Sequence, residues 1–135
     1  MLFFDFYATR QFGEFEQARF EKTKAAFLRT AAQARARGIR LILAYVPMKY
    51  RVYGDLCTYP SGSQCPYWHP WDLESRFAAF CRDNGIEYLP ITEPMHRAAA
   101  AGAVLYAPED SHWSADGHRF VARLIQERLN APDAP

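Results

Sequence analysis

The chain has 135 residues, half of them hydrophobic and 16% aromatic, with a net charge of +1 at neutral pH. The aromatic content excludes a disordered chain, and the length predicts a single domain, 1–135, with room for one sizeable core. The charge balance predicts no nucleic-acid partner. No apolar run approaches the roughly 18 residues of a membrane-spanning helix, so no such segment is expected.

The first third of the chain predicts a helix followed by a buried strand. Residues 2–7 are a short aromatic run, expected to be a strand or a packed entry segment. Residues 14–37 predict a long helix that ends at Gly38. The apolar run 39–46 is of strand length, and runs of this kind are typical of parallel sheets covered by helices. The apolar face of the helix is expected to hold Phe20, Phe27, Leu28, Ala31 and Ala34.

Residues 48–71 predict a long irregular loop rich in Tyr, Trp, Gly and Ser. Loops of this length in compact domains are usually functional or held by a local cross-link. The spacing of Cys57 and Cys65 permits one disulfide across the loop without requiring it, while Cys81 is expected in the core. No metal site is expected, because the chain has no CxxC pair and no histidine at finger-like spacing.

The second half continues the alternation of helices and strands. A helix is expected at 72–84, with Asp72 as its cap, and a strand at 86–89. Because that helix forms a crossover, the strands at 40–46 and 86–89 are expected to be parallel neighbours, which gives an α/β fold. A small helix at 92–101 and a final helix capped by Ser114 follow. The buried face of the final helix is expected to hold Val121, Leu124, Ile125 and Leu129.

Residues that could take part in catalysis are concentrated at 110–118, where a loop meets the final helix. Asp110 stands two positions before His112, and a carboxylate so placed can orient one imidazole nitrogen. The other nitrogen is then free to act as a base toward a nucleophilic hydroxyl. An ordinary helix start explains the same residues, because Asp-x-His is a common pattern. His69 and His96 are isolated in the sequence and are expected to be surface or loop residues.

A resemblance to a known protein family favours a catalytic role for these residues over an ordinary helix start. The block that holds Leu105, Asp110-Ser111-His112-Trp113 and Gly117-His118 resembles the closing block of SGNH (GDSL-like) hydrolases, in the variant of alginate O-acetyltransferase-type proteins. The stretches at 46–49 and 86–89 resemble core strands of that group, and the resemblance runs from about residue 14 to residue 129. It implies a flavodoxin-like parallel sheet between two helical layers. It also implies that Asp110 is the triad acid and His112 the base.

Two further residues are expected at the site. The resemblance implies that Trp113 packs beside the triad, where it would contact substrate, and that His118 is structural. Lys49 follows a strand end and would lie near the ligand edge of an open α/β sheet, as a substrate-binding residue or as a solvated charge.

The nucleophile is the main departure from the family. Its serine lies in a Gly-Asp-Ser block near the start of the fold, and no such block occurs here, since Gly54-Asp55 is followed by Leu56. The resemblance therefore implies the C-terminal portion of an SGNH domain, with the serine on an N-terminal portion that precedes Met1. The serines of the chain are each expected to be structural or solvated, among them Ser61, Ser63, Ser111 and Ser114.

The resemblance implies a serine esterase or O-acyltransferase that acts on acylated carbohydrate or another small ester, without a cofactor. It implies a periplasmic or extracellular location, and the isolated chain is expected to be inactive. The alternative is a non-catalytic α/β module that keeps the Asp–His pair and only binds. Aromatic residues of the loop could stack on sugar rings, although packing within the loop is favoured: Tyr45, Tyr50, Tyr53, Tyr59, Tyr67, Trp68 and Trp71.

Overall fold

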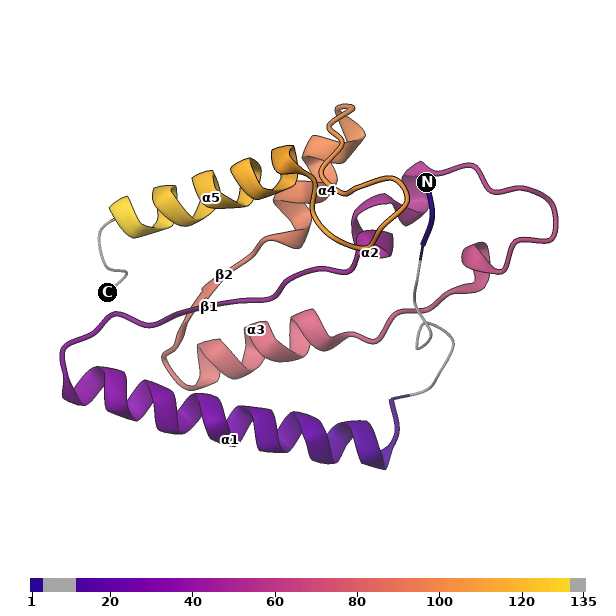
Figure 1. The fold of residues 1–135 in the computed structure, drawn as a ribbon. Coiled ribbons are helices and arrows are strands. Elements are labelled where there is room, and N and C mark those ends of the chain that lie inside the picture. Colours follow the sequence, from indigo (N-terminus) through magenta and orange to yellow (C-terminus); the bar gives the residue numbers. More distant parts are fainter. Residues whose placement is uncertain (4–11, 132–135) are drawn as a thin grey trace.

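Two short parallel strands form the centre of the structure, with helices on both sides (Figure 1). The computed structural model describes residues 1–3 and 12–131, so most of the first aromatic run lies outside the described residues. None of the helices in the described part combines the length and the hydrophobicity that a membrane span needs. The elements are α1 (Glu14–Ala36), β1 (Ile42–Ala44), α2 (Lys49–Tyr53), α3 (Leu73–Asp83), β2 (Glu87–Leu89), α4 (Thr92–Ala100) and α5 (Ala115–Asn130), with 3-10 turns at Gly54–Leu56 and Cys65–Tyr67.

The pairing of the strands confirms the predicted α/β fold. β1 and β2 are parallel, with Ile42 opposite Glu87 and Ala44 opposite Leu89. α3 lies on the connection between them, as a crossover requires. β1 is shorter than the apolar run that predicted it and pairs with β2 only over its three residues. None of these three residues is fully buried, and Ile39 and Val46 at the two ends of the run are exposed, so the prediction of a buried strand was wrong.

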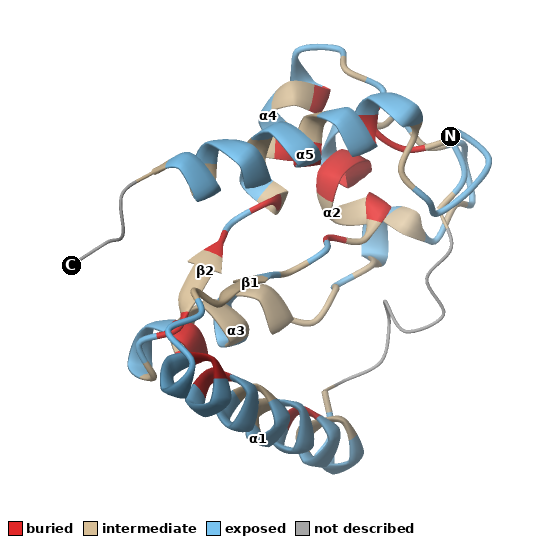
Figure 2. Cartoon of the chain, turned by 60° about the vertical axis from the view of Figure 1, so that its left-hand side comes forward, coloured by how far each residue is buried: buried red, intermediate tan, exposed pale blue. Residues whose placement is uncertain are grey.

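Side chains of the strands alternate between two hydrophobic clusters, one on each face of the sheet. Leu43 and Tyr88 pack against the cluster of α1 and α3, whereas Ile42 and Leu89 pack with the cluster of α2, α4 and α5. Figure 2 shows that the buried positions of the helices turn toward the sheet. The chain therefore has three layers with a core on each side of the sheet, rather than the one core that its length suggested.

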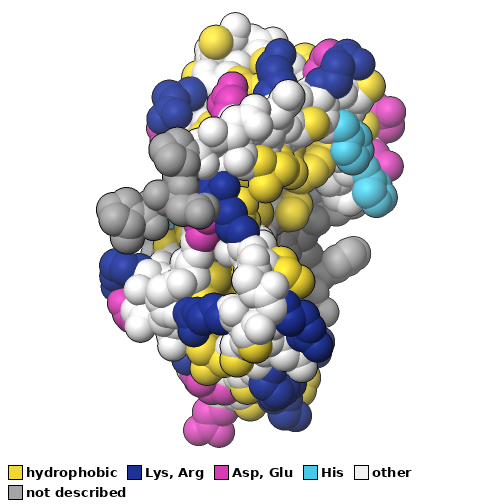
Figure 3. All heavy atoms as spheres, turned by 90° about the vertical axis from the view of Figure 1, so that its left-hand side faces the viewer, with side chains coloured by type: hydrophobic (Ala, Val, Ile, Leu, Met, Phe, Trp, Pro, Cys, Tyr) yellow, Lys and Arg dark blue, Asp and Glu magenta, His cyan; other side chains and the backbone are white. Residues whose placement is uncertain are grey.

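The buried face of α1 is as predicted at Phe20, Ala31 and Ala34, but Leu28 is exposed. In α5, Val121 is buried, whereas the prediction of burial was wrong for the last two apolar positions, Ile125 and Leu129. Figure 3 shows hydrophobic side chains gathered between the two halves of one face of the molecule.

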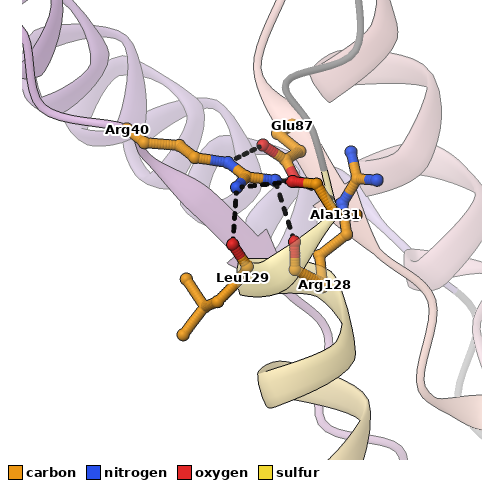
Figure 4. Close-up of polar contacts among 5 residues, drawn as sticks. All are labelled: Arg40, Glu87, Arg128, Leu129 and Ala131. Atoms are coloured by element: carbon orange, nitrogen blue, oxygen red, sulfur yellow. Dashed lines mark hydrogen bonds and ion pairs between the residues drawn. The ribbon is translucent and has the colours of Figure 1, made fainter.

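Polar contacts, rather than apolar packing, attach the end of α5 to the sheet (Figure 4). Arg40 donates from Nε and from a terminal nitrogen to the two Glu87 carboxylate oxygens, each at 2.8 Å. It also donates to the carbonyl oxygens of Arg128 at 3.0 Å, and of Leu129 and Ala131 at 3.3 Å. Helix ends leave such carbonyls without partners, so Arg40 caps α5. This explains why Leu129 can remain exposed.

The stretch 48–71 contains more structure than predicted. Its start forms α2, which packs against α4 and buries Val52 and Tyr53. Cys57 and Cys65 are free in this structure, so the disulfide that their spacing permitted without requiring is not formed, and Cys81 is buried as predicted. Tyrosines hold the loop instead: Tyr50 Oη donates to the carbonyl of Cys65, and Tyr59 Oη to that of Gly54, both at 2.7 Å.

Candidate active site

A tight turn, residues 107–112, carries the predicted acid and base. Tyr106 and Trp113 form an antiparallel bridge, and the amide of Ala107 donates to the carbonyl of His112 at 3.0 Å. Ser114 closes the turn and caps α5, because its Oγ accepts from the amide of Gly117 at 3.1 Å. The turn is thus fixed between the core and the first turn of a helix.

The predicted contact between Asp110 and His112 is confirmed. Asp110 Oδ1 lies 2.6 Å from His112 Nδ1 and accepts a second hydrogen bond from the His112 amide at 3.1 Å. These bonds from His112 lower the pKa of the Asp110 carboxyl. With Nδ1 engaged, Nε2 is the nitrogen left to exchange a proton. The His112 side chain is 83% exposed. The catalytic roles of the two residues stay a prediction.

Lys49 is buried and holds the turn in place through hydrogen bonds. The residue is only 4% exposed, and its Nζ donates to the carbonyl oxygens of Ala107, Pro108 and Asp110 at 2.5, 2.9 and 2.8 Å. Burial lowers the pKa of the ammonium group, while the charges of neighbouring acids oppose that shift. Lys49 is therefore not a solvated charge, and its three donors are engaged by the turn. Substrate contact by Lys49 stays a prediction.

Trp113 packs beside the turn, as the resemblance implied. Its ring meets the ring of His118 edge to face, with centroids 5.4 Å apart. The indole nitrogen is buried, and no acceptor in the described part of the chain has hydrogen-bond geometry toward it. Close packing here requires Gly117, since a Cβ at that position would lie 2.0 Å from the carbonyl oxygen of Leu105. Substrate binding by Trp113 stays a prediction.

No serine of the described residues forms a hydrogen bond with the His112 ring. Ser111 Oγ contacts Asp110 Oδ1 at 3.5 Å, and Ser114 is used as the cap. Ser63 Oγ accepts from the amide of Cys65 at 3.2 Å. Across residues 1–3 and 12–131, no three His, Cys, Asp or Glu side chains gather as a metal site would require. A nucleophile for His112 is thus not assigned by these contacts.

A second Asp–His pair was missed by the sequence reasoning. His96 lies on α4, and its Nε2 is 3.0 Å from Asp55 Oδ2, so the residue is not the isolated surface histidine that was expected. The two lie 41 positions apart, so no spacing in the sequence signals them. Both line a cleft of about 710 Å³, to which neither Asp110 nor His112 contributes.

Residues 2–134 match a protein family described as the SGNH hydrolase-like domain of acetyltransferase AlgX. The chain belongs to this family. Among the curated relatives of this AlgX-type chain is the probable alginate O-acetylase AlgJ of Pseudomonas putida. The two are 31% identical over 93 residues, which are 69% of this chain and 23% of AlgJ.

The solved O-acetyltransferase domain of Pseudomonas putida AlgJ has a similar fold, with a TM-score of 0.64 at 23% identity. The match covers 88% of this chain and 42% of that one, so the chain spans less than half of the solved structure. These findings confirm the family resemblance and the fold drawn from the sequence. The chain is an SGNH-like acetyltransferase-family sequence related to AlgJ and AlgX.

Proposed function

We propose that Asp110 and His112 are the acid and the base of a Ser-His-Asp triad that transfers an acetyl group to or from a carbohydrate hydroxyl. The observation that carries the proposal is the 2.6 Å contact between Asp110 Oδ1 and His112 Nδ1 on a fixed turn. A carboxylate in this position holds the ring in one tautomer and stabilises the imidazolium that forms during the reaction. The names of the AlgJ and AlgX relatives support acetyl transfer as the reaction.

The proposed reaction has two balanced halves. First, His112 Nε2 takes the proton of a serine hydroxyl as the serine oxygen attacks the acetyl carbonyl of the donor ester. The bond from the carbonyl carbon to the donor oxygen breaks, and His112 returns the proton to that oxygen. In the second half, an acceptor hydroxyl gives its proton to Nε2 and attacks the acetyl-serine. The serine oxygen leaves and takes the proton back, and water in place of the acceptor gives hydrolysis.

The serine is proposed to come from a part of the protein outside these 135 residues. Support comes from the five serines of this chain, none of which forms a hydrogen bond with the His112 ring.

A periplasmic or extracellular location belongs to the proposal as well. Thiol titration of the unfolded, unreduced protein bears on that location. One free thiol would mean that Cys57 and Cys65, which are free in this structure, pair in an oxidising compartment, whereas three free thiols would reject the pairing.

The decisive experiment uses the whole protein of which these residues are part. Hydrolysis of 4-nitrophenyl acetate and transfer to an oligosaccharide acceptor should both be lost in His112→Ala, by about a thousandfold or more. His69→Ala removes an exposed loop histidine and is the matched control. A fluorophosphonate label followed by peptide mass spectrometry should identify the serine. Labelling of Ser61 or Ser63, or full activity in His112→Ala, would refute the assignment.

A binding module that keeps the pair without turnover is the second candidate. The 83% exposure of the His112 side chain favours it, because water weakens the electrostatic interactions on which catalysis depends. The same experiment separates the two candidates: a binding module gives no turnover in the unmodified protein and no serine labelling.

A further inference from the structure

The first residues of the chain lie against the turn 107–112. The amide of Leu2 donates to the carbonyl oxygen of Pro108 at 2.7 Å. Figure 1 shows this end of the chain beside α2 and the loop that leads into α5. Leu2 and Phe3 are the two members of the aromatic run 2–7 that the structure describes, and neither belongs to a strand. This part of the run is therefore a packed entry segment, one of the two forms expected from the sequence.

The carbonyl oxygen of Pro108 accepts from two donors that come from different parts of the chain. Besides the Leu2 amide, Lys49 Nζ donates to it at 2.9 Å, and the same ammonium group donates to the carbonyl oxygens of Ala107 and Asp110. A carbonyl oxygen has two lone pairs, so its capacity to accept hydrogen bonds is filled. The turn is thus held by α2 through Lys49 and by the start of the chain through Leu2.

The ring of Phe3 fixes the position of this first segment. Phe3 packs against the hydrophobic cluster of α2, α4 and α5. Its ring meets the Tyr50 ring edge to face, with centroids 5.5 Å apart, and lies 6.1 Å from the Tyr59 ring. Lys49 Nζ lies 6.0 Å from the centroid of the Phe3 ring. One ring therefore contacts the two tyrosines that hold the stretch 48–71 and the lysine that holds the turn.

The position of the Phe3 ring matters for Lys49 because that ammonium group is buried. Lys49 is only 4% exposed, and its three donors are directed at carbonyl oxygens of the turn. An aromatic ring beside the cation attracts it without taking one of these donors, and the ring also excludes water. Water that reached the ammonium group would compete for the same hydrogen bonds. Loss of the Phe3 ring should therefore weaken the hold of Lys49 on the turn.

We infer that Phe3 is a positioning residue for the turn that carries the proposed acid and base, and that Leu2 acts with it. Phe3 acts through Lys49, and Leu2 acts through its amide. The effect on catalysis rests on the proposed function, whereas the hold on the turn stands on these contacts alone. A catalytic group that is displaced by about 1 Å can lose about a hundredfold in rate, so a small loosening of the turn is measurable.

Hydrolysis of 4-nitrophenyl acetate by the whole protein tests the effect on catalysis. Phe3→Ala should lower kcat by about ten- to a hundredfold and leave KM within about twofold, because a displaced catalytic pair slows the reaction without removing a substrate contact. Phe3→Tyr keeps the ring and should retain most of kcat. Phe15→Ala makes the same change at an exposed ring of α1 and is the matched control. Unchanged kcat in Phe3→Ala, or a loss confined to KM, would overturn the positioning role.

Hydrogen exchange of the whole protein tests the hold on the turn without any turnover. The amides of Ala107 and Asp110 are bonded within the turn, so their exchange reports its opening. Leu2→Pro removes the amide that donates to Pro108, and Leu2→Ala keeps it. Both turn amides should exchange about tenfold faster in Leu2→Pro than in Leu2→Ala, and Phe3→Ala should also accelerate them.

Amides in the middle of α1 should exchange at the same rate in all of these variants, which separates a loosened turn from a general loss of folding. Equal exchange of the turn amides in Leu2→Pro and Leu2→Ala would reject the role of the Leu2 amide. Faster exchange of the turn in a protein that shows no turnover would refute the proposed triad and keep the hold on the turn. The two failures therefore give different results.

Discussion

The Nζ atom of Lys49 lies 2.8 Å from the carbonyl oxygen of Asp110, so a buried cation holds the backbone of the residue that orients His112. Lys49 begins α2, and α2 packs on α4. The position of the Asp110 turn is therefore tied to the core of the fold. The neighbouring Asp110–His112 contact is local, but the lysine contact joins positions 61 apart.

Lys49→Met should destabilise the protein by about 2–4 kcal/mol, because the carbonyls of Ala107, Pro108 and Asp110 would lose their shared donor in a buried place. Urea unfolding measures the loss. Lys22→Met, at an exposed position on α1, is the matched control and should stay within about 0.5 kcal/mol of the unmodified protein. If both variants unfold at the same urea concentration, Lys49 does not hold the turn.

Asp110→Asn tests whether the two site residues act as one unit. The amide keeps the shape of the carboxylate but cannot stabilise an imidazolium, so esterase activity of the whole protein should fall by about a hundred- to ten-thousandfold. The double variant with His112→Ala should be no worse than His112→Ala alone, because groups that act together are not additive. The Ser111→Ala variant, in which the changed residue lies between Asp110 and His112 in the sequence, should remain active. Additive losses in the double variant would show separate roles.

Gly117→Ala should destabilise the protein by about 2–3 kcal/mol, although alanine favours helices by about 1 kcal/mol over glycine. The added Cβ would lie 2.0 Å from the Leu105 carbonyl oxygen and force α5 away from the site turn. Ala122→Gly, at an exposed position of the same helix, should cost about 1 kcal/mol. Thermal unfolding compares the two. A rise in midpoint for Gly117→Ala would show that the turn can move aside.

Features set by local sequence were predictable. Gly38 and Gly102 adopt positive φ after the helices that they were expected to end, and Ser114 caps α5 as expected. The Asp110–His112 contact belongs to this class, because two positions on one turn fix the reach of both side chains. The parallel pairing of β1 and β2 followed from the helix that links them, because a crossover connection joins parallel neighbours.

Features set by distant residues were not predictable. α2 has five residues, too few for a periodic pattern, and its stability comes from packing on α4. The Asp55–His96 pair joins two elements that only the fold brings together. The exposure of Leu129 follows from the Arg40 cap, since an arginine 89 positions away supplies the contact that burial would otherwise provide.

Glu87→Gln should lower stability at neutral pH and lose that effect in acid. Hydrogen bonds from Arg40 and Arg128 lower the pKa of the Glu87 carboxyl below its ordinary value of 4.5. A lowered folded-state pKa gives stability that is present above the ordinary value and is lost as the pH falls through the lowered one. The free energy of unfolding of the variant should therefore be lower than that of the unmodified protein by about 1–3 kcal/mol at pH 7. This difference should narrow toward about pH 3. Urea unfolding at both pH values measures it, with the exposed Glu127→Gln as the control. A difference that stays constant with pH would show that the charge of Glu87 does not stabilise the end of α5.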